Sequence, residues 1–419
     1  MKNLSIIGAG AAGTMVANHL RRELSADWIL TVIDPAPEHL YQPGLLFLPF
    51  GARDEAKIRR RRGRTLGRGV QWIQRPVQLV DPDKRKVMLE GAESVSYDLL
   101  VIASGSHVRP EETPGLMGSE WRRSIHDFYT LEGALKLREA LTEFRGGRIV
   151  LNVAEMPIKC PVAPMEWLFL ADAFFRKRGI RDRVELIYVT PLDGAFTKPV
   201  CNVRLSHMLK QKGIHLETEF GLAEVDPDGQ KLVSYDERHV QYDLLVSIPV
   251  HKGAEFIGAS GLGNDMNFIP TDKHTLRVKG QDHIFALGDA TDLPSSKAGS
   301  VAHFQSGVLT RNIMRAIRGQ SLLMDFDGHA NCFIETGFGK ALLIDFNYDV
   351  QPLPGKFPVP GFGPFTLLGE SRVNHLGKLA FRWLYWNFLM PARQLPISDQ
   401  MSMAGKQVVT EEEMMKAAV

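Results

Sequence analysis

The chain has 419 residues, of which 44% are hydrophobic and 23% are charged, so it can bury the cores of two or three globular domains. Its net charge of +2 gives no general attraction for nucleic acid. Three cysteines without a Cys-x-x-Cys pair exclude a disulfide scaffold and give no sign of a metal site. No uninterrupted apolar run reaches the roughly 18 residues that a membrane-spanning helix needs.

The first 34 residues predict a strand, a glycine turn, a helix and a second strand that ends in an acid. The glycines are Gly8, Gly10 and Gly13, and the acid is Asp34. In a dinucleotide-binding unit the first glycine permits the tight turn, the second lets a pyrophosphate approach, and the third lets the helix pack closely. The helix N-terminus favours the phosphates and the acid accepts from ribose hydroxyls. We therefore predict a dinucleotide site here.

Two features of the first 70 residues bear on location. Lys2 and the apolar residues after it resemble a signal peptide, but cleavage would remove the glycine turn, so we expect none. Residues 53–68 hold eight basic side chains against two acids, which exceeds the net charge of the whole chain. This stretch is either a solvated surface or a segment attracted to an anionic membrane.

Two later strands end in residues that suit the same site. One reads as a buried strand and ends at Ala103 and Gly105, small enough for a ligand to approach the sheet. The other ends at Gly288 and Asp289, whose carboxylate can face a ribityl or phosphate group. Lys297 follows, and it is either an ordinary surface lysine or a group that stabilises negative charge on a reduced cofactor.

The middle of the chain keeps a second Rossmann-like pattern but lacks its phosphate site. Residues 148–153 predict a strand, after which a second glycine fingerprint would bind a nicotinamide nucleotide. The chain has bulky side chains and prolines there instead, with Cys160 among them. The next strand, 184–189, ends without a ribose-binding acid. We therefore expect no NAD site in this part.

The last hundred residues have a different composition. Cys332 precedes a predicted strand pair, and a segment rich in proline, glycine and phenylalanine follows. Residues 379–391 contain five aromatic side chains, with Lys378 and Arg393 nearby. This pattern predicts an interfacial helix with Trp and Tyr at the level of the lipid headgroups. A core helix or a dimer contact is the alternative.

Together these segments predict an α/β protein with two Rossmann-like dinucleotide-binding domains and a C-terminal membrane-associating region. The first domain would take residues 1–110 and 245–320, and the second residues 111–244. Residues 321–419 would form the C-terminal region with its cysteine.

The chain resembles the sulfide:quinone oxidoreductases, a family within the two-dinucleotide-domain disulfide reductase superfamily. The resemblance covers nearly the whole chain, and its specific part is a cysteine at the lost second fingerprint combined with another in the C-terminal region. The branch that includes the mitochondrial enzymes is the most similar, since the third cysteine that other branches have upstream is missing from residues 111–159. The matching segments are the first fingerprint, 41–43, 103–105, 157–164, 271–276, 288–290, 293–297, Cys332 with 345–348, and 384–387.

The resemblance implies FAD as the cofactor and a redox-active disulfide between Cys160 and Cys332, with or without extra bridging sulfur. Hydrosulfide would attack one sulfur and leave a persulfide there. The freed thiolate, on Cys332 by family precedent, would then attack the flavin, to which two electrons pass.

Four further residues near these segments have candidate roles. Lys159 and His329 could lower the pKa values of the two redox cysteines, or they could be solvated side chains. Glu166 is a candidate proton acceptor six residues beyond the first redox cysteine. Cys201 has no counterpart in the family pattern, and we interpret it as structural.

With no nicotinamide site, the resemblance implies a quinone as the electron acceptor. The expected partners are sulfide, a quinone, a sulfane-sulfur acceptor such as glutathione, sulfite or polysulfide, and one face of an energy-transducing membrane that the protein binds peripherally. The sequence leaves a homo-oligomer open and points to no nucleic acid. Candidates for the apolar walls of the quinone site are Phe346, Tyr348, Phe362, Phe365 and Tyr385.

Three alternatives remain at this point. A type II NADH:quinone oxidoreductase would need the second glycine fingerprint and its acid, and both are missing. The flavin subunit of a sulfide-oxidising flavocytochrome is exported, whereas we expect no signal peptide here. A non-catalytic flavin-binding scaffold would have no need of both Cys160 and Cys332.

Overall fold

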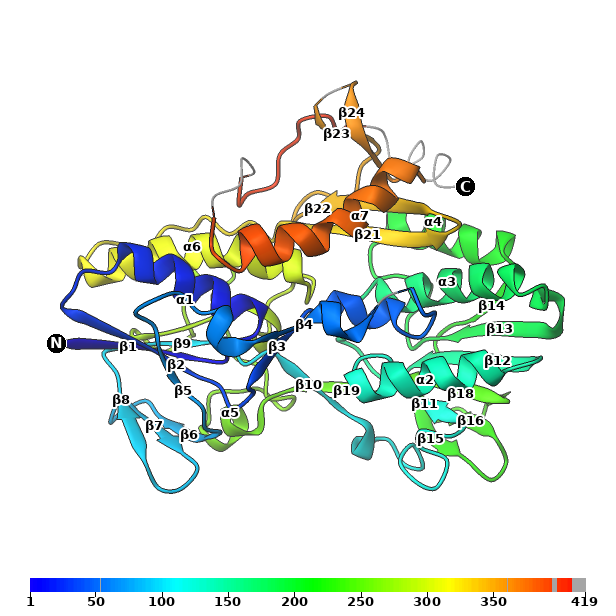
Figure 1. Ribbon diagram of the computed structural model, residues 1–419, viewed down its shortest axis with the longest axis horizontal. Helices are drawn as coiled ribbons and strands as arrows, with labels where there is room; N and C mark the ends of the chain where they lie inside the picture. The colour runs from blue at the N-terminus through cyan, green and yellow to red at the C-terminus, as the bar shows by residue number, and fades with distance from the viewer. Residues whose placement is uncertain (53, 360, 394–397, 409–419) are drawn as a thin grey trace.

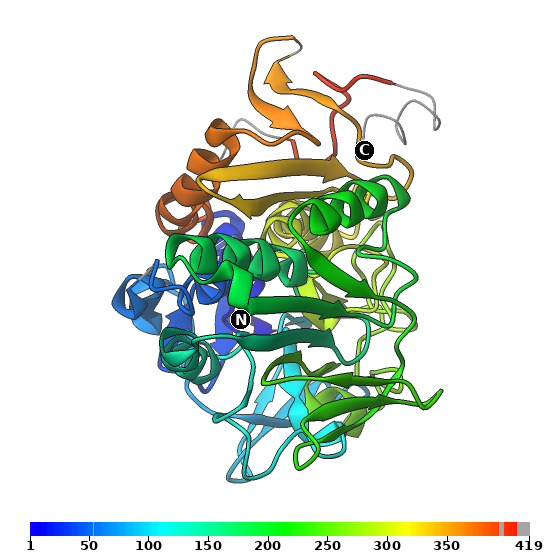
Figure 2. The same cartoon turned by 90° about the vertical axis from the view of Figure 1, so that its right-hand side faces the viewer.

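The computed structural model describes residues 1–52, 54–359, 361–393 and 398–408. Two five-stranded parallel sheets form the two ends of the molecule, and a four-stranded sheet with a helix lies across one side of both (Figures 1 and 2). A continuous hydrophobic core joins all three parts, with Met15, Phe169, Ile334 and Trp386 among its buried members. This arrangement brings the C-terminal part of the chain over the junction between the two parallel sheets.

The first parallel sheet has the strand order β20-β9-β1-β2-β5. Its glycine turn connects β1 to α1, which packs beside α6 on one face of the sheet (Figure 1). The predicted strand–turn–helix–strand unit is therefore confirmed. The elements are β1 (Lys2–Ile7), α1 (Ala11–Glu23), β2 (Trp28–Ile33), β5 (Gln71–Ile73), β9 (Leu99–Ile102), β20 (Ile284–Ala286) and α6 (Gly299–Ile317), with the antiparallel β6 (Val77–Asp81), β7 (Lys86–Leu89) and β8 (Ser94–Ser96) beside them.

The second parallel sheet has the order β11-β18-β12-β13-β14. Its strand β18 pairs with β12, so the domain boundary that we placed between residues 244 and 245 falls inside a strand of this sheet. The elements are β11 (Ile125–His126), α2 (Leu131–Glu143), β12 (Gly147–Val153), α3 (Ala163–Lys177), β13 (Val184–Val189), α4 (Pro199–Gln211), β14 (Ile214–Glu217) and β18 (Leu244–Ile248), with the antiparallel β15 (Leu222–Asp226), β16 (Lys231–Ser234) and β17 (His239–Gln241).

Short strand pairs complete the connections. An antiparallel pair, β10 (Ser106–Arg109) with β19 (Val250–Gly253), forms the crossing between the two parallel sheets. A second pair, β3 (Glu38–Leu40) with β4 (Arg59–Arg61), follows β2. A short helix, α5 (Glu255–Ala259), comes after β19.

The C-terminal sheet has the order β21-β22-β24-β23 and is followed by α7. The predicted strand pair after Cys332 is confirmed, although its first strand begins earlier, before the cysteine. The elements are β21 (Ala330–Gly337), β22 (Lys340–Phe346), β23 (Gly355–Val359), β24 (Gly363–Leu367) and α7 (Arg372–Leu384), which continues into a π-helical turn, Tyr385–Leu389.

The aromatic segment of the C-terminal region divides into two parts. Tyr385 and Trp386, which we expected at the level of lipid headgroups, are only 2% and 5% exposed, so that expectation is wrong for these two. They pack against His39 and Tyr41 because the π-helical turn directs them into the protein. The outer face of α7 carries exposed apolar side chains, and among the described residues no helix is long and apolar enough to cross a membrane. The exposed residues are Val373, Leu376, Leu379 and Trp383.

Candidate redox site

The first glycine turn has no room for side chains at Gly8 and Gly13, but it has open space at Gly10, where a ligand would approach. Gly8 has a φ of +93°, and a Cβ on it would lie 2.5 Å from the carbonyl oxygen of Ala103. A Cβ on Gly13 would lie 1.9 Å from the carbonyl oxygen of Gly8. At Gly10 an added Cβ would meet nothing within 4 Å, and no side chain caps the helix that starts there. The turn therefore leaves the helix N-terminus accessible to a phosphate.

Asp34 is held at the end of β2 by two backbone donors and an arginine. Its Oδ2 accepts from Ala9 N at 2.6 Å, and its Oδ1 accepts from Ala36 N at 2.8 Å and from Arg62 Nη2 at 3.2 Å. Arg62 is only 4% exposed, so this member of the basic stretch lines the candidate nucleotide site and does not face solvent or a membrane. Arg53, at the start of that stretch, lies outside the described residues.

The two later strand ends lie beside the glycine turn. Gly105 has a φ of +72° and open space around it, and Ser104 Oγ is buried without a hydrogen-bond partner. A Cβ on Gly288 would lie 3.2 Å from Ala12 Cβ of α1. Asp289 follows it, and burial raises the pKa of its carboxyl group while Lys297 opposes that shift.

Cys160 lies in the loop between β12 and α3, where a second glycine fingerprint would be. Its φ is +50°, a left-handed conformation that is uncommon for a residue with a side chain and that often occurs at functional sites. Its backbone N–H donates to the carbonyl oxygen of Lys297 at 2.7 Å. The Lys297 ammonium in turn donates to the carbonyl oxygens of Asp289 and Thr291 at 3.0 and 2.6 Å. Lys297 thus connects the first redox cysteine to the Asp289 loop.

Cys332 reaches the same region from β21 of the C-terminal sheet. Ser300, at the start of α6, donates to the carbonyl oxygen of Asn331 at 2.7 Å, which fixes the backbone next to this cysteine. The thiols of Cys160 and Cys332 are not bonded to each other in this structure. Burial raises the pKa of both thiols, that of Cys332 to about 12, and charge on Cys332 raises the pKa of Cys160 further. The two sulfurs therefore share one buried environment.

A buried Glu–Lys pair lies beside both thiols. Glu166, on the first turn of α3, accepts from the backbone N–H of Glu335 at 2.7 Å and from the Lys378 ammonium. Lys378, on α7, also donates to the carbonyl oxygen of Phe333 at 2.8 Å, one residue beyond Cys332. Burial opposes the charge of Lys378, but Glu166 and Glu335 outweigh it and raise its pKa. The ammonium lowers the pKa of both thiols, against the effect of burial.

A family model described as pyridine nucleotide-disulphide oxidoreductase matches residues 2–317. This chain belongs to that family. It is 28% identical over 392 residues to the mitochondrial sulfide:quinone oxidoreductase of Mus musculus, covering 92% of this chain and 85% of that protein. It is 26% identical over 402 residues to the mitochondrial protein of the same name from Dictyostelium discoideum, covering 94% and 87%. In fold it is similar to the sulfide:quinone oxidoreductase from the bacterium Aquifex aeolicus, with a TM-score of 0.76, 20% identity and 92% coverage of both chains.

FAD is the cofactor of this pyridine nucleotide-disulphide oxidoreductase, and the first nucleotide site suits it. The open Gly10, the free N-terminus of α1 and the unpartnered Ser104 Oγ provide space and donors for a dinucleotide. Asp34 would hold its ribose, and Asp289 lies where it can face the ribityl chain. The loop between β12 and α3 has Cys160 and flanking prolines where a second fingerprint would have glycines.

Lys378 lowers the pKa values of both thiols, a role for which Lys159 and His329 were candidates in the sequence. Lys159 donates to the carbonyl oxygen of Ser106 at 3.3 Å and faces Asp289 electrostatically. His329 binds Asp345 Oδ1 through Nε2 at 2.8 Å and stacks on Phe304. The sequence holds no signal for the role of Lys378, because only the burial of residues such as Asn374 shows which side of the amphipathic helix α7 faces inward.

The structure does not bring the quinone candidates into one cluster. Phe365 contacts Phe333, the residue after Cys332, at 5.5 Å between ring centroids. Tyr385 binds His39 Nε2 at 2.6 Å, while Tyr348 packs on Phe326 and donates to the carbonyl oxygen of Lys273. The remaining two differ in exposure: Phe346 is 5% exposed and lies beside Lys198, whereas Phe362 is 88% exposed at the β23–β24 turn.

Proposed function

We propose that this protein oxidises sulfide at a Cys160–Cys332 pair and passes two electrons through FAD to a quinone. The main support is that these two cysteines, which come from distant segments of the chain, lie together beside the Glu166–Lys378 pair. Relatives named sulfide:quinone oxidoreductase that match over 92% and 94% of this chain support it.

In the proposed cycle the oxidised state is a disulfide between the two cysteines. Hydrosulfide attacks one sulfur, forms a new S–S bond there and breaks the bond between the cysteines. The electron pair of the broken bond stays on the other cysteine, Cys332, as a thiolate that the Lys378 ammonium stabilises. Glu166 accepts the proton that the incoming sulfide loses when it enters as H₂S.

The sulfane sulfur left on Cys160 is transferred to an acceptor such as glutathione, sulfite or polysulfide, which restores a thiolate on Cys160. Cys160 and Cys332 then re-form their S–S bond, and bound FAD would accept the two electrons that this oxidation releases. Lys297 holds the loop of Asp289 and the backbone of Cys160 in a fixed relation, and so it positions the thiol relative to the cofactor site. Phe365, whose ring contacts Phe333 beside Cys332 in the sequence, is our first candidate for a wall of the quinone site.

We also propose that the protein binds one face of an energy-transducing membrane through α7. The exposed apolar face of that helix, with Trp383 61% exposed, suits insertion among lipid headgroups. The side chains on its inner face, including Lys378, reach the redox cysteines, so the same helix would connect the membrane to the site. A quinone could then enter from the bilayer.

The main alternative, NADH oxidation with a quinone acceptor, needs a dinucleotide site after β12. An anaerobic titration distinguishes the two: sulfide should bleach the flavin absorbance and NADH should not. Cys160→Ser and Cys332→Ser should keep their flavin and lose sulfide-driven quinone reduction, whereas Cys201→Ala, which removes the buried third thiol, should retain it. Bleaching by NADH alone, or near-normal turnover in either serine variant, contradicts the proposal.

A further inference from the structure

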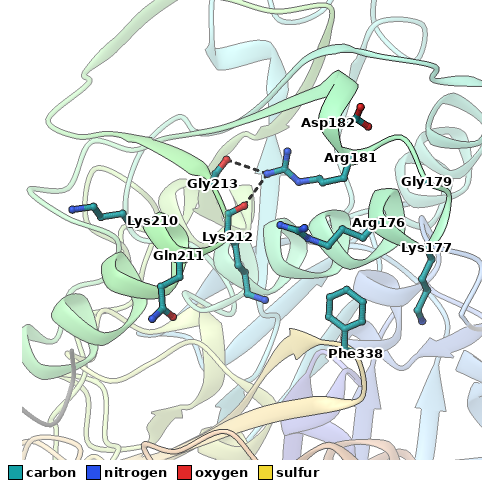
Figure 3. Close-up of a pocket in the computed structure, with 10 residues that line it drawn as sticks. All are labelled: Arg176, Lys177, Gly179, Arg181, Asp182, Lys210, Gln211, Lys212, Gly213 and Phe338. Atoms are coloured by element: carbon teal, nitrogen blue, oxygen red, sulfur yellow. Dashed lines mark hydrogen bonds between the residues drawn. The ribbon is translucent and has the colours of Figure 1, made fainter.

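A basic pocket lies at the end of the molecule away from the first sheet. It has a volume of about 870 Å³ and forms where the C-terminal ends of α3 and α4 meet the β21–β22 turn. Figure 3 shows the side chain of Phe338, on that turn, below the cationic side chains of the two helices. Ten residues line it, with Asp182 the one acid, and the cationic ones are Arg176, Lys177, Arg181, Lys210 and Lys212.

Arg181 forms the fixed wall of the pocket. Its guanidinium donates to Asp172 Oδ1 at 2.8 Å and to the carbonyl oxygen of Val184 at 2.6 Å. It also donates to the carbonyl oxygens of Lys212 and Gly213 at 2.9 and 3.0 Å, the two bonds drawn in Figure 3. These bonds join α3, β13 and the end of α4 into one unit. The pocket is therefore built from packed secondary structure.

The other cationic side chains of the pocket are not needed as hydrogen-bond donors to the C-terminal carbonyl groups of α3 and α4. The last carbonyl groups of α3 accept from backbone N–H groups, as Phe174 does from Arg178 and Arg176 from Gly179. The last carbonyl groups of α4 accept in the same way from Lys212 N and Gly213 N. These carbonyl groups therefore do not need the basic side chains as hydrogen-bond donors.

Three cationic side chains of the pocket remain available to a ligand, namely Arg176, Lys177 and Lys210. Arg176 uses only its Nε, which donates to Asp172 at 3.0 Å, so its two terminal nitrogens are free to bind an oxyanion. Lys212 is already paired, since its Nζ is 3.9 Å from Asp172 Oδ2 and 5.5 Å from the ring centroid of Phe169. Within the described parts of the chain, Lys177 and Lys210 have no ion-pair or hydrogen-bond partner for their side chains. This local positive charge exceeds the net charge of +2 of the whole chain.

We propose that this pocket binds a ligand with clustered phosphate groups, whose apolar portion lies against Phe338. Several cations converging on one cavity attract a multiply charged anion more strongly than a single carboxylate, and an arginine fork matches a phosphate. Phe338 is 49% exposed at the pocket rim and offers an apolar surface beside the charges. The ligand is either a soluble organic polyphosphate or the headgroup of an anionic lipid, and both present this chemistry.

The pocket is separate from the redox site. Cys160 precedes the N-terminal end of α3 and the pocket lies at its C-terminal end, so a 15-residue helix of about 22 Å stands between them. Its variants can therefore be tested without touching the cysteines. The β21–β22 turn lies close to α7, since a Cβ on Gly339 would be 4.0 Å from His375, which places the pocket beside the helix that we propose to meet the membrane.

The test measures binding of inorganic tripolyphosphate to the FAD-loaded protein by isothermal titration calorimetry. We expect one site per chain, weakened roughly tenfold or more by Lys177→Gln/Lys210→Gln, because each lost charge removes a charge-assisted hydrogen bond. The matched control, Lys136→Gln/Arg138→Gln on α2, removes the same charge from another helix and should bind like the unaltered protein. Sulfide oxidation in detergent should be unchanged in both double variants.

Sedimentation with vesicles identifies the source of the phosphate. Loss of binding by the pocket variant to vesicles of phosphatidylcholine with 20% phosphatidylglycerol, but not to pure phosphatidylcholine, assigns the pocket to a lipid headgroup. Unchanged vesicle binding with weakened tripolyphosphate binding assigns it to a soluble ligand. Absence of tripolyphosphate binding in the unaltered protein, or equal losses in the pocket and control variants, overturns the proposal.

Discussion

At the level of single residues, the ammonium of Lys378 is the positive charge that acts on the redox site. It is the only ammonium that acts on both redox thiols among the described residues, and it is held between Glu166 and the carbonyl oxygen of Phe333. Burial alone would keep the thiols protonated, because it raises their pKa values. The positive charge of Lys378 opposes this effect and therefore reduces the free-energy cost of forming a thiolate in this environment.

Replacing Lys378 with methionine should slow sulfide-dependent flavin reduction about 100-fold or more, because a thiolate loses its charge partner and Glu166 is left buried and unpaired. The alkylation of Cys332 by iodoacetamide should also shift to higher pH, a change that a merely structural role would not produce. Lys378→Arg should recover part of the rate. Lys340→Met, which removes an exposed cation from the neighbouring strand, serves as the control; a folded Lys378→Met protein with normal rates would refute the role.

Helix α7 shows how one element can serve two environments. Its inner side contributes Asn374, whose amide binds four backbone groups, and Lys378 at the redox site. Its outer side presents Leu376 and Trp383. The following π-helical turn rotates Tyr385 and Trp386 inward, because an extra residue in the turn changes which side chains face the core. The apolar outer face is thus shorter than the sequence indicated.

Exchanging two outward residues of α7, as Leu376→Ser/Trp383→Ser, should lower the partition coefficient onto lipid vesicles by roughly tenfold or more, since each buried apolar side chain contributes about 1.5–3 kcal/mol. The thermal midpoint of unfolding should stay within a few degrees because both side chains are exposed. The control, Met117→Ser/Tyr235→Ser, removes two exposed apolar side chains that are distant from α7 in the sequence, and it should leave the partition coefficient unchanged. Co-sedimentation with liposomes measures both variants, and equal partitioning of the two would count against α7.

At the level of the whole molecule, buried neutral histidines join parts distant in sequence. His39, after β2, binds Tyr385 of the C-terminal region, and burial together with Arg62 lowers its pKa to about 3. His251, on β19 between the two sheets, has its pKa lowered to about 3 by burial. A histidine in the unfolded chain has a pKa near 6.5, so below that pH the unfolded chain binds protons that the folded chain does not bind. Between these values the free energy of unfolding falls as the pH falls.

For His39 alone this effect amounts to about 3 kcal/mol between pH 7 and pH 4. His39→Gln keeps a group that can hydrogen-bond Tyr385 and cannot be protonated, so it should remove that share of the pH dependence. Urea unfolding at the two pH values measures it, with His215→Gln, an exposed histidine on β14, as the control. A His39→Gln protein whose pH dependence equals that of the control would show that His39 is not protonated on unfolding.

Much of the fold was predictable because its signals are local. The glycine turn, Asp34 and the absence of a second fingerprint before Cys160 all follow from residue type and spacing, and the strand order around β1 agrees with them. The candidate site was predictable only in part. Lys378 and Arg62 could not be assigned from sequence, since a lysine in an amphipathic helix and an arginine in a basic run look like solvated residues until their neighbours are known.

By itself, the sequence determined that this chain has one intact dinucleotide site and a cysteine where the second would be, since a tight turn and a close phosphate approach depend on glycines at fixed spacing. Tertiary structure alone decided what surrounds that cysteine. Cys332, Glu166 and Lys378 come from three elements far apart in the chain and share a site only because one hydrophobic core closes over them. Their pKa values follow from burial and from that proximity, and no local pattern encodes either.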